Sequence, residues 1–339
     1  MTTKKDIESA LMRGADTLRD TIDAANYKDY VLPVMFVKYL SDSYTDAVEE
    51  LSKQYAGIRL ERQKKYLPFM VAEGCSFYDL YQQRFADNIG QLMNAAMRQI
   101  EADNNQQLAG VLSAVDYNSE NALGTREHKN AILRDLLEDF EPLDLRPSAI
   151  EVKEGQVPAD VIGDAYEYMI GQFASMAGKK AGSFYTPAAV SEIMARIVDV
   201  QPGERVYDPT CGSGSLLIKA AKKQNSKEVS IYGQEVNGSS VAMAKMNMYI
   251  HEIRDAKIGW GDTLANPVFL DADGNLLLFD AIVANMPFSK DKWASGFNPG
   301  GESSGKGKKE FKMEASLDKF HRFDWGVPPA SKGDWAFLL

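Results

Sequence analysis

Short apolar runs alternate with helix-like stretches through the second half of the sequence, and this alternation constrains the fold more than any other feature. Four strand-like runs and two helical stretches follow one another, at residues 204–207, 216–224, 229–232, 239–253, 257–259 and 279–284. Strands that alternate with helices form parallel sheets, because each helix carries the chain back to the end at which the next strand starts. We therefore expect an α/β domain with a doubly wound, Rossmann-like sheet.

The first half of the sequence has a different pattern, in which apolar residues recur every three to four positions. Near the start they are Ile7, Leu11, Ala15, Leu18 and Ile22, with charged residues on the opposite face. Further helical stretches are residues 30–44, 91–109 and 128–140. No period-two alternation interrupts them, so this half is predicted to be an all-α domain.

Three prolines interrupt the helical pattern between the two halves, namely Pro142, Pro147 and Pro158. We place the domain boundary there, with an α-helical N-terminal domain at residues 1–155 and the α/β domain at residues 156–339. A helix at residues 161–173 and a glycine-containing loop at residues 178–182 are expected to lead into the sheet.

Composition excludes several classes of protein. The 339 residues suffice for about two domains. No apolar run reaches the ~20 residues that a membrane span needs, and the charged N-terminus is unlike a signal peptide. Two cysteines and three scattered histidines make neither a disulfide framework nor a zinc site. A cytoplasmic protein with no metal site and no membrane partner is expected.

The chain is acidic, with 38 basic and 48 acidic residues and a net charge of −10. Since Lys and Arg supply most of the affinity for DNA, a nucleic-acid substrate would require a partner or a local basic patch. Residues 290–332 hold nine Lys or Arg against six Asp or Glu and are rich in glycine. Their composition predicts a solvated, poorly ordered surface loop, placed where it can move over a bound polyanion.

The strand at Val206 runs into a glycine-rich turn, Asp208-Pro209-Thr210-Cys211-Gly212-Ser213-Gly214-Ser215, and a helix follows at once. Such a turn lets the backbone approach a ligand, and its N–H groups favour an anionic group such as a carboxylate. It matches neither the phosphate loop nor the dinucleotide motif. An acid at Asp208 would repel a pyrophosphate but suits an ammonium or sulfonium group. S-adenosylmethionine carries both, so we expect it as the cofactor.

Acidic side chains also follow the next two strands. Glu235 can accept hydrogen bonds from both ribose hydroxyls, as acids do at this position in dinucleotide folds. Asp262 can accept from an adenine amino group. A single acid at a strand end often only caps a helix, but acids at three successive strand ends favour a cofactor site.

The fourth strand runs into Asn285-Met286-Pro287-Phe288, and here the sequence resembles a known family. This motif, with the glycine-rich turn, looks like the DNA adenine N6-methyltransferases of the gamma order. Ser183-Phe184-Tyr185-Thr186-Pro187, with Ala188 after it, resembles that family's first cofactor-binding segment. Three N-terminal stretches are similar to the helical domain of M (modification, HsdM-type) subunits of type I restriction-modification systems: residues 14–19, 23–28 and 36–42.

The resemblance implies a role for each residue of the motif. Asn285 Oδ1 and the Met286 carbonyl would accept the amino protons of adenine and favour a tetrahedral nitrogen in the transition state. Phe288 would stack on a base flipped out of the duplex. The family usually has proline at position 286, so the site is expected to work with less preorganisation. A cysteine nucleophile for cytosine C5 methylation is absent from this motif.

The resemblance also implies partners. These are double-stranded DNA with a flipped base, a specificity (S) subunit that reads the sequence, a restriction (R) subunit and a second M subunit. Residues 333–339 look like the start of an amphipathic helix, whereas members of the family usually continue. The chain is therefore expected to be a piece of a longer protein or a short variant.

Two alternatives remain open at this point. One is an N-methyltransferase that acts on a protein glutamine or a ribosomal RNA base, since similar motifs occur there. The other is a scaffold subunit that binds the cofactor and the S subunit with little turnover, which Met286 and the early ending both suggest.

Overall fold

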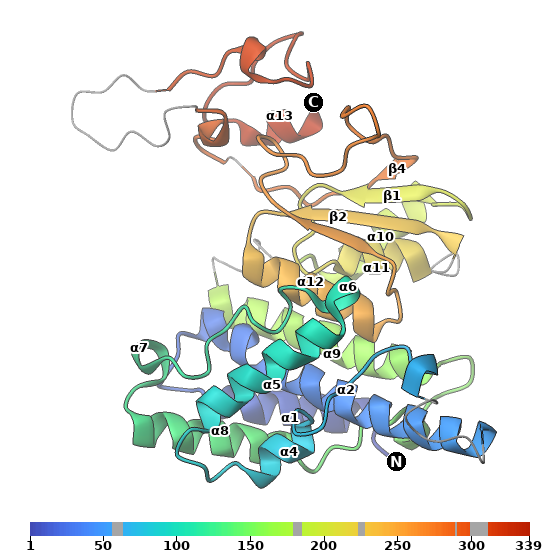
Figure 1. Ribbon diagram of the computed structural model, residues 1–339. Coiled ribbons are helices and arrows are strands. Elements are labelled where there is room, and N and C mark those ends of the chain that lie inside the picture. Colours follow the sequence, from blue (N-terminus) through green and yellow to red (C-terminus); the bar gives the residue numbers. More distant parts are fainter. Residues whose placement is uncertain (56–63, 179–184, 223–227, 289, 299–310) are drawn as a thin grey trace. The chain divides into compact units, whose positions relative to one another are not determined.

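The computed structural model describes residues 1–55, 64–178, 185–222, 228–288, 290–298 and 311–339. The chain forms two compact units (Figure 1). The helical unit is Met1–Ala181 with Lys245–Arg254, and the sheet unit is Gly182–Ala244 with Asp255–Leu339. Among the described residues, no helix is long and apolar enough to cross a membrane.

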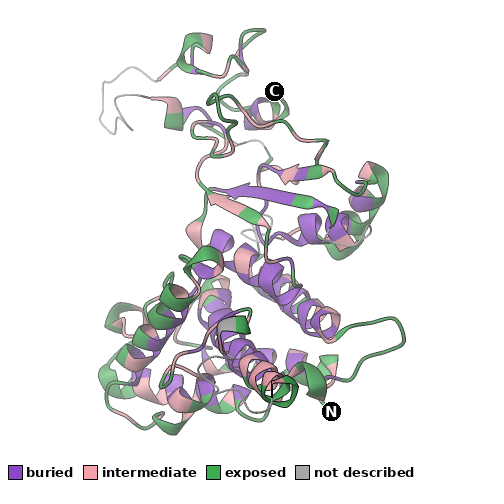
Figure 2. Ribbon diagram, turned by 45° about the vertical axis from the view of Figure 1, so that its right-hand side comes forward, coloured by how far each residue is buried: buried purple, intermediate pink, exposed green. Residues whose placement is uncertain are grey.

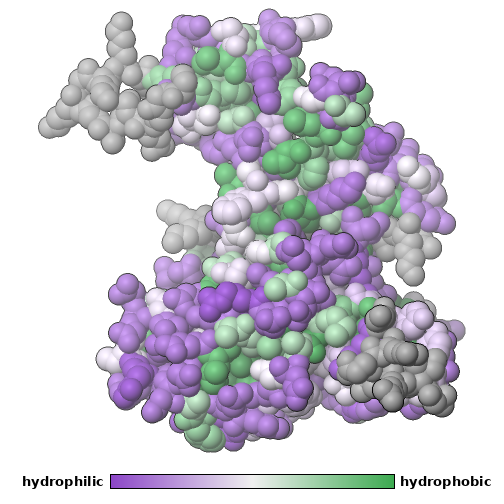
Figure 3. All heavy atoms as spheres, in the orientation of Figure 1, coloured by the Kyte–Doolittle hydropathy of each residue, from purple (hydrophilic) through white to green (hydrophobic). Residues whose placement is uncertain are grey.

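The helical unit is built from amphipathic helices whose apolar faces meet in one core. Its helices are α1 (Lys4–Thr17), α2 (Tyr27–Gln54), α4 (Phe77–Gln82), α5 (Ile89–Asp103), α6 (Asn105–Leu108), α7 (Glu120–Leu123), α8 (Arg126–Phe140) and α9 (Pro158–Ala177). Thr3 and Ser76 begin α1 and α4 with capping boxes. Figure 2 shows the buried residues on the inner faces of the helices, and Figure 3 shows mainly hydrophilic residues on the visible outer surface.

Two helices differ from the sequence expectation. The stretch at residues 30–44 is part of the longer α2, which continues through Pro33 although proline cannot donate a helical hydrogen bond. The expected helix at residues 91–109 is broken at Asn104 into α5 and α6. The Asn104 side chain bonds the backbone N–H and carbonyl of Met70 and the Ile100 carbonyl, so a tertiary contact ends α5.

The sheet unit confirms the expected parallel sheet. Its strands are β1 (Arg205–Asp208), β2 (Ser230–Glu235), β3 (Lys257–Trp260) and β4 (Ala281–Ile282). They are parallel and lie in the order β3-β2-β1-β4. β4 is shorter than the expected strand at residues 279–284, but backbone hydrogen bonds from Asp280 and Val283 to β1 extend the contact. A helical N-terminal domain followed by a parallel-sheet domain is the fold predicted from the sequence.

The two faces of the sheet are covered differently. Helix α11 (Ser215–Lys222) packs on β1 and β2, and α10 (Ala188–Val198) packs on α11. The opposite face carries an aromatic cluster, in which Tyr207 stacks on Phe279 with ring centroids 4.4 Å apart and Tyr232 contacts Phe269. Helix α12 (Gly238–Ile250) begins in the sheet unit, and its C-terminal part, from Lys245, belongs to the helical unit.

The segment after the fourth strand is more compact than its composition suggests. Its described parts, residues 290–298 and 311–339, bury Trp293 and Phe323 almost completely in one hydrophobic cluster. We call this the C-terminal cluster; its other buried members are Leu264, Ala294, Met313 and Ala336. The expectation of a solvated, poorly ordered loop therefore does not hold for these described residues, and residues 299–310 lie outside the description.

A buried ion pair in the helical unit gives a first testable prediction. Lys38 Nζ donates to Asp42 Oδ2 and to the Tyr78 hydroxyl, each at 2.7 Å, and the Lys38 side chain is fully buried. Lys38→Met would leave the Asp42 carboxylate buried without its cation, so we expect the free energy of unfolding to fall by about 3 kcal/mol.

Urea unfolding followed by circular dichroism measures this loss. The matched control is Lys4→Met, because Lys4 is exposed and pairs with the partly exposed Glu8 at the same i,i+4 spacing. We expect a loss of about 0.5 kcal/mol or less there. Equal losses in the two variants would show that burial does not determine the strength of the Lys38 pair.

Candidate functional site

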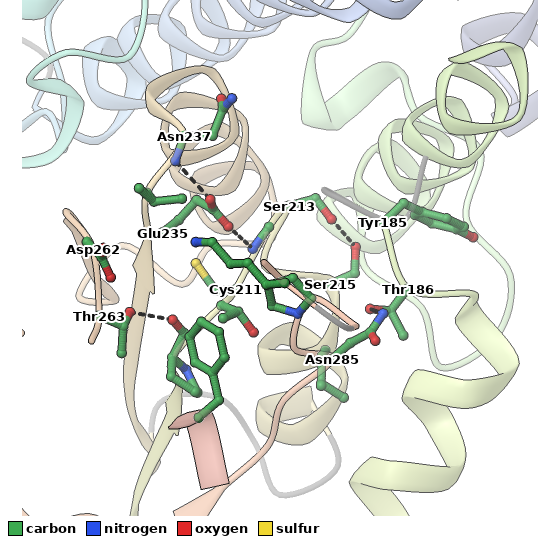
Figure 4. Close-up of a pocket in the computed structure, with 18 residues that line it drawn as sticks. Tyr185, Thr186, Cys211, Ser213, Ser215, Glu235, Asn237, Asp262, Thr263 and Asn285 are labelled. Carbon is green, nitrogen blue, oxygen red and sulfur yellow. Dashed lines mark hydrogen bonds between the residues drawn. The ribbon is translucent and has the colours of Figure 1, made fainter. Parts of the chain in front are cut away.

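A cavity of about 410 Å³ opens at the carboxyl ends of the strands in the sheet unit (Figure 4). Its volume lies within the range of roughly 300–1,000 Å³ that is usual for small-molecule sites. Nine residues that the sequence singled out line it: Tyr185, Thr186, Gly212, Ser213, Ser215, Glu235, Asp262, Asn285 and Pro287. They come from five separate parts of the chain, which the parallel sheet brings together.

The topology explains why the cavity is at this place. The chain builds β1, β2 and β3 outward in one direction and then returns to place β4 on the other side of β1. In open α/β sheets, ligands bind in the crevice outside the carboxyl ends of the strands, where the strand order reverses in this way. The residues that follow β1 and β4 therefore lie on either side of that crevice.

The turn after β1 depends on two glycines with left-handed backbone conformations. Gly212 has φ +52° and Gly214 has φ +77°, values that other residues rarely adopt. Ser213 and Ser215 hydroxyl oxygens are 2.9 Å apart at the start of α11. The turn thus brings backbone N–H groups and two hydroxyls to the wall of the cavity, which is the arrangement that favours an anionic group.

Glu235 is almost completely buried at the end of β2 and is held by the backbone. Its Oε2 accepts the Gly212 N–H at 3.0 Å, and its Oε1 accepts the Asn237 N–H at 2.8 Å. Burial raises the pKa of Glu235, and these N–H groups and the charge of Lys290 oppose the rise. Each carboxylate oxygen can accept a second hydrogen bond, so a ligand hydroxyl can still bind.

Asp262 lies in the loop after β3, and its carboxylate is also tied to backbone groups. Its Oδ1 accepts the Leu264 N–H at 2.9 Å and the Ala265 N–H at 3.4 Å. The neighbouring Thr263 hydroxyl donates to the Pro209 carbonyl of the glycine-rich turn. The loop and the turn therefore form one continuous wall of the cavity.

Asn285 is joined to the first predicted cofactor segment. Its Nδ2 donates to Thr186 Oγ1 at 3.2 Å, and both residues line the cavity. Because the amide hydrogen serves this contact, Oδ1 is left as an acceptor. The structure thus brings Tyr185 and Thr186 together with Asn285 and Pro287 at one cavity.

Several predicted site residues do not line the cavity. Asp208 is 2% exposed, and its Oδ1 accepts the Thr210 N–H. Phe288 is 81% exposed. The others outside the lining are Pro187, Ala188, Gly214 and Met286. Ser183 and Phe184 lie outside the described residues.

The structure adds nine lining residues that the sequence analysis did not assign: Pro209, Thr210, Cys211, Leu216, Val236, Asn237, Thr263, Lys290 and Phe337. Most are direct neighbours of predicted residues, and that proximity was the available signal. Phe337 has no such signal, because it reaches the cavity only through the fold of the C-terminal cluster. Within the described residues, no three His, Cys, Asp or Glu side chains gather as metal ligands would.

Burial shifts the pKa of the two ionisable side chains of the turn, Asp208 and Cys211. It raises the pKa of Asp208 to about 7, and the nearby Glu235 adds to the rise. It also raises the pKa of the Cys211 thiol, and the charges of Asp208 and Glu235 act in the same direction. Cys211 is therefore a protonated, packed thiol and not a nucleophile.

The parallel sheet, the glycine-rich turn and the carboxylates after β2 and β3 together define a Rossmann-like domain, with a cavity at the position where such sheets bind nucleotide cofactors. Family models give the particular family: the model described as N-6 DNA Methylase matches residues 157–339, and the model described as HsdM N-terminal domain matches residues 7–140. Since the first match covers more than half of the chain, the chain belongs to the N-6 DNA methylase family.

Individual relatives agree with this. The chain is 29% identical to the type I restriction enzyme MjaVIII methylase subunit of Methanocaldococcus jannaschii, over 97% of this chain and 53% of that protein. It is 29% identical to the MpnII methylase subunit of Mycoplasma pneumoniae, over 98% of this chain and 64% of that protein. The chain thus spans about half to two thirds of these relatives.

A solved structure also resembles the whole chain. The type I restriction-modification system methyltransferase subunit from Streptococcus thermophilus matches with a TM-score of 0.73 and 30% identity. The match covers 99% of this chain and 71% of that one. Sequence and fold therefore agree on the family.

The raised pKa of Asp208 predicts a pH effect on stability. Between the ordinary value of 3.8 and about 7, the folded state holds a proton that the unfolded state has lost. The contribution of this group to the free energy of unfolding therefore falls as pH rises through that window. Asp208→Asn keeps an acceptor for the Thr210 N–H but cannot ionise, so we expect it to gain stability relative to the unchanged protein as pH rises.

Urea unfolding at several pH values between about 5 and 8 measures this difference. Asp273→Asn, in an exposed turn of the same unit, is the matched control. Stability curves of Asp208→Asn and the unchanged protein that stay parallel throughout the range would contradict the assignment of this proton to Asp208.

Proposed function

We propose that this chain is the modification (M) subunit of a type I restriction-modification system and that it transfers a methyl group from S-adenosylmethionine to N6 of adenine in DNA. The observation that carries the proposal is the bond between Asn285 and Thr186 at a cavity that Glu235 and Asp262 also line. This bond supports a role for Asn285 as the amino-group acceptor next to the cofactor. The family and its type I methylase relatives support the same conclusion.

The residues of the cavity fit S-adenosylmethionine. The buried Glu235 provides acceptors for two ribose hydroxyls, and Asp262 provides one for the adenine amino group. The N–H groups of the turn at residues 212–215 suit the carboxylate of the amino-acid end. We propose that the segment at residues 183–188, with Asp208 and Gly214 supporting the turn, completes the site. When bound, the cofactor supplies an electrophilic methyl group on a positive sulfur.

The side chains of the motif then act on the target base. Asn285 Oδ1 and the Met286 carbonyl accept the two amino protons of adenine, which frees the nitrogen lone pair from the ring. Phe288 is largely exposed and thus accessible for stacking on a base flipped out of double-stranded DNA. Pro287 lines the cavity beside them and restricts Met286 to an extended conformation.

Partners follow from the same proposal. With a net charge of −10, the chain is poorly suited to hold DNA alone. We propose that an S subunit reads the target sequence, that a second M subunit joins the complex, and that an R subunit adds cleavage. An N-methyltransferase of protein glutamine or ribosomal RNA is not favoured, because the HsdM N-terminal domain matches residues 7–140.

Mapping N6-methyladenine in DNA from cells that express the chain, with and without its S subunit, tests the proposal. We expect methylation only with the S subunit and only within one recognition sequence. If both proteins are folded and associated, bind S-adenosylmethionine and leave DNA unmethylated, the chain is a scaffold subunit and the proposed activity is wrong.

Replacing Asn285 tests its role in methyl transfer. Asn285→Ala removes one amino-group acceptor, so we expect kcat to fall by about 100-fold or more. The affinity for S-adenosylmethionine should change little, because the cofactor contacts are assigned to other residues. Single-turnover methylation and calorimetric binding measure the two effects, with Asn275→Ala in an exposed turn as the control. An equal loss in kcat and affinity would place Asn285 in the cofactor site instead.

A substitution at Met286 tests whether a more rigid backbone at the motif speeds methyl transfer. Met286→Pro keeps the carbonyl acceptor but fixes φ and restricts Asn285, so we expect kcat to rise severalfold with unchanged cofactor affinity. The measurement is the methylation rate at saturating cofactor. An unchanged kcat would show that the flexibility of residue 286 does not limit the reaction.

A further inference from the structure

Arg322, in the C-terminal part of the sheet unit, binds the loop that follows β3. Its guanidinium donates from Nη1 to the Thr263 carbonyl at 3.3 Å and from Nη2 to the Leu264 carbonyl. The Arg322 side chain is only 13% exposed. A residue almost 60 positions away in sequence is thus attached to the loop that carries Asp262.

A buried acid fixes the guanidinium. Asp318 accepts from Arg322 Nε at 3.1 Å and from Nη2 at 2.9 Å, and its side chain is 1% exposed. Asp318 also accepts the backbone N–H groups of Phe320 and Arg322. Burial alone would raise the pKa of Asp318, but the hydrogen bonds from Arg322 lower it below its usual value. A two-pronged, charge-assisted pair of this kind holds the arginine in one orientation.

Two peptide groups connect Arg322 with the Asp262 carboxylate. The Thr263 and Leu264 carbonyls that accept from Arg322 belong to the same peptide groups as the Leu264 and Ala265 N–H groups. Those N–H groups donate to Asp262 Oδ1. Because a peptide group is planar and rigid, fixing its carbonyl also fixes its N–H direction. Arg322 therefore determines how the Asp262 carboxylate is held, without contacting it.

Gly296 also packs against this loop. A Cβ added at Gly296 would lie 2.5 Å from the Ala265 Cβ and 3.0 Å from Asp262 Oδ2. The backbone at residue 296 therefore lies directly against the carboxylate, and only glycine fits there. The Thr263 hydroxyl donates to the Pro209 carbonyl, which also ties the loop to the glycine-rich turn.

We propose that Arg322, fixed by Asp318, is a positioning residue for adenine recognition and that it acts by orienting Asp262. The inference rests on the proposed function, in which Asp262 accepts the adenine amino group of the cofactor. It assigns part of the cofactor site to the segment that follows the Asn285 motif. The close approach of Gly296 to Asp262 supports the same conclusion independently.

Binding of S-adenosylhomocysteine and 5′-methylthioadenosine, measured by calorimetry, tests the proposal. Both ligands contain the adenosine group, and only the first has the amino-acid end. We expect Arg322→Ala to weaken both by about the same factor, on the order of tenfold. Arg322→Lys should recover little of this, because one ammonium cannot serve two carbonyls and Asp318 in a fork geometry. Arg196→Ala is the control, since Arg196 and Glu192 form an exposed pair with the same spacing.

A double-mutant cycle separates positioning from a general structural effect. If Arg322 acts through Asp262, Arg322→Ala should cause almost no further loss in an Asp262→Ala background. Additive losses would overturn the proposal. Gly296→Ala should also weaken binding, and adding Ala265→Gly should restore part of it by removing the closest atom. Circular dichroism shows whether the Arg322 variants are folded. If they are not, the Gly296→Ala and Ala265→Gly variants still test the proposal.

The outcomes distinguish the two proposals. If the unchanged protein binds neither ligand, the proposed cofactor site itself is wrong. If it binds them and the Arg322 and Gly296 variants bind equally well, the cofactor site stands and the positioning role is overturned.

Discussion

The buried carboxylate of Glu235 is the interaction on which the site depends. It joins the end of β2 to the glycine-rich turn after β1, because one oxygen accepts the Gly212 N–H and the other the Asn237 N–H. Each such bond to a charged group contributes about 1.5–3 kcal/mol, which offsets part of the cost of burial. The link adds to the backbone hydrogen bond from the Cys211 N–H to the Gln234 carbonyl, so together they hold the turn against the second strand at the wall of the cavity.

Charge explains which ligand the site suits. Asp208, Cys211 and Glu235 lie together, and burial raises the pKa of all three. Of the three, Cys211 and Glu235 line the cavity. A cationic ligand there would favour the charged form of Glu235, as the charge of Lys290 already does. A sulfonium cofactor thus fits the electrostatics as well as the hydrogen-bonding groups, whereas a pyrophosphate would add to the repulsion.

The sequence revealed the local part of this arrangement and not the tertiary part. Glu235 and Asp262 were identified because the residue after a strand is set by the strand pattern itself. The direction of the Asp208 side chain is harder to predict. Asp208 lies two residues after the buried Val206 on β1, so both side chains point to the same face of the sheet and into the protein. Composition misled for residues 290–332, since the glycine and lysine count hid Trp293 and Phe323, which form a core.

In the proposed function, the C-terminal cluster lies between the cofactor site and the motif that acts on the target base. Its aromatic core holds Phe337 at the cavity, and Arg322 holds the loop of Asp262. The segment that contains both residues begins directly after the Asn285 motif. Asn285 in turn is bonded to Thr186, which lies before the sheet in sequence. The proposed target motif and Asp262, the proposed acceptor for the adenine of the cofactor, therefore belong to connected parts of one unit, so we propose that a change at one affects the other.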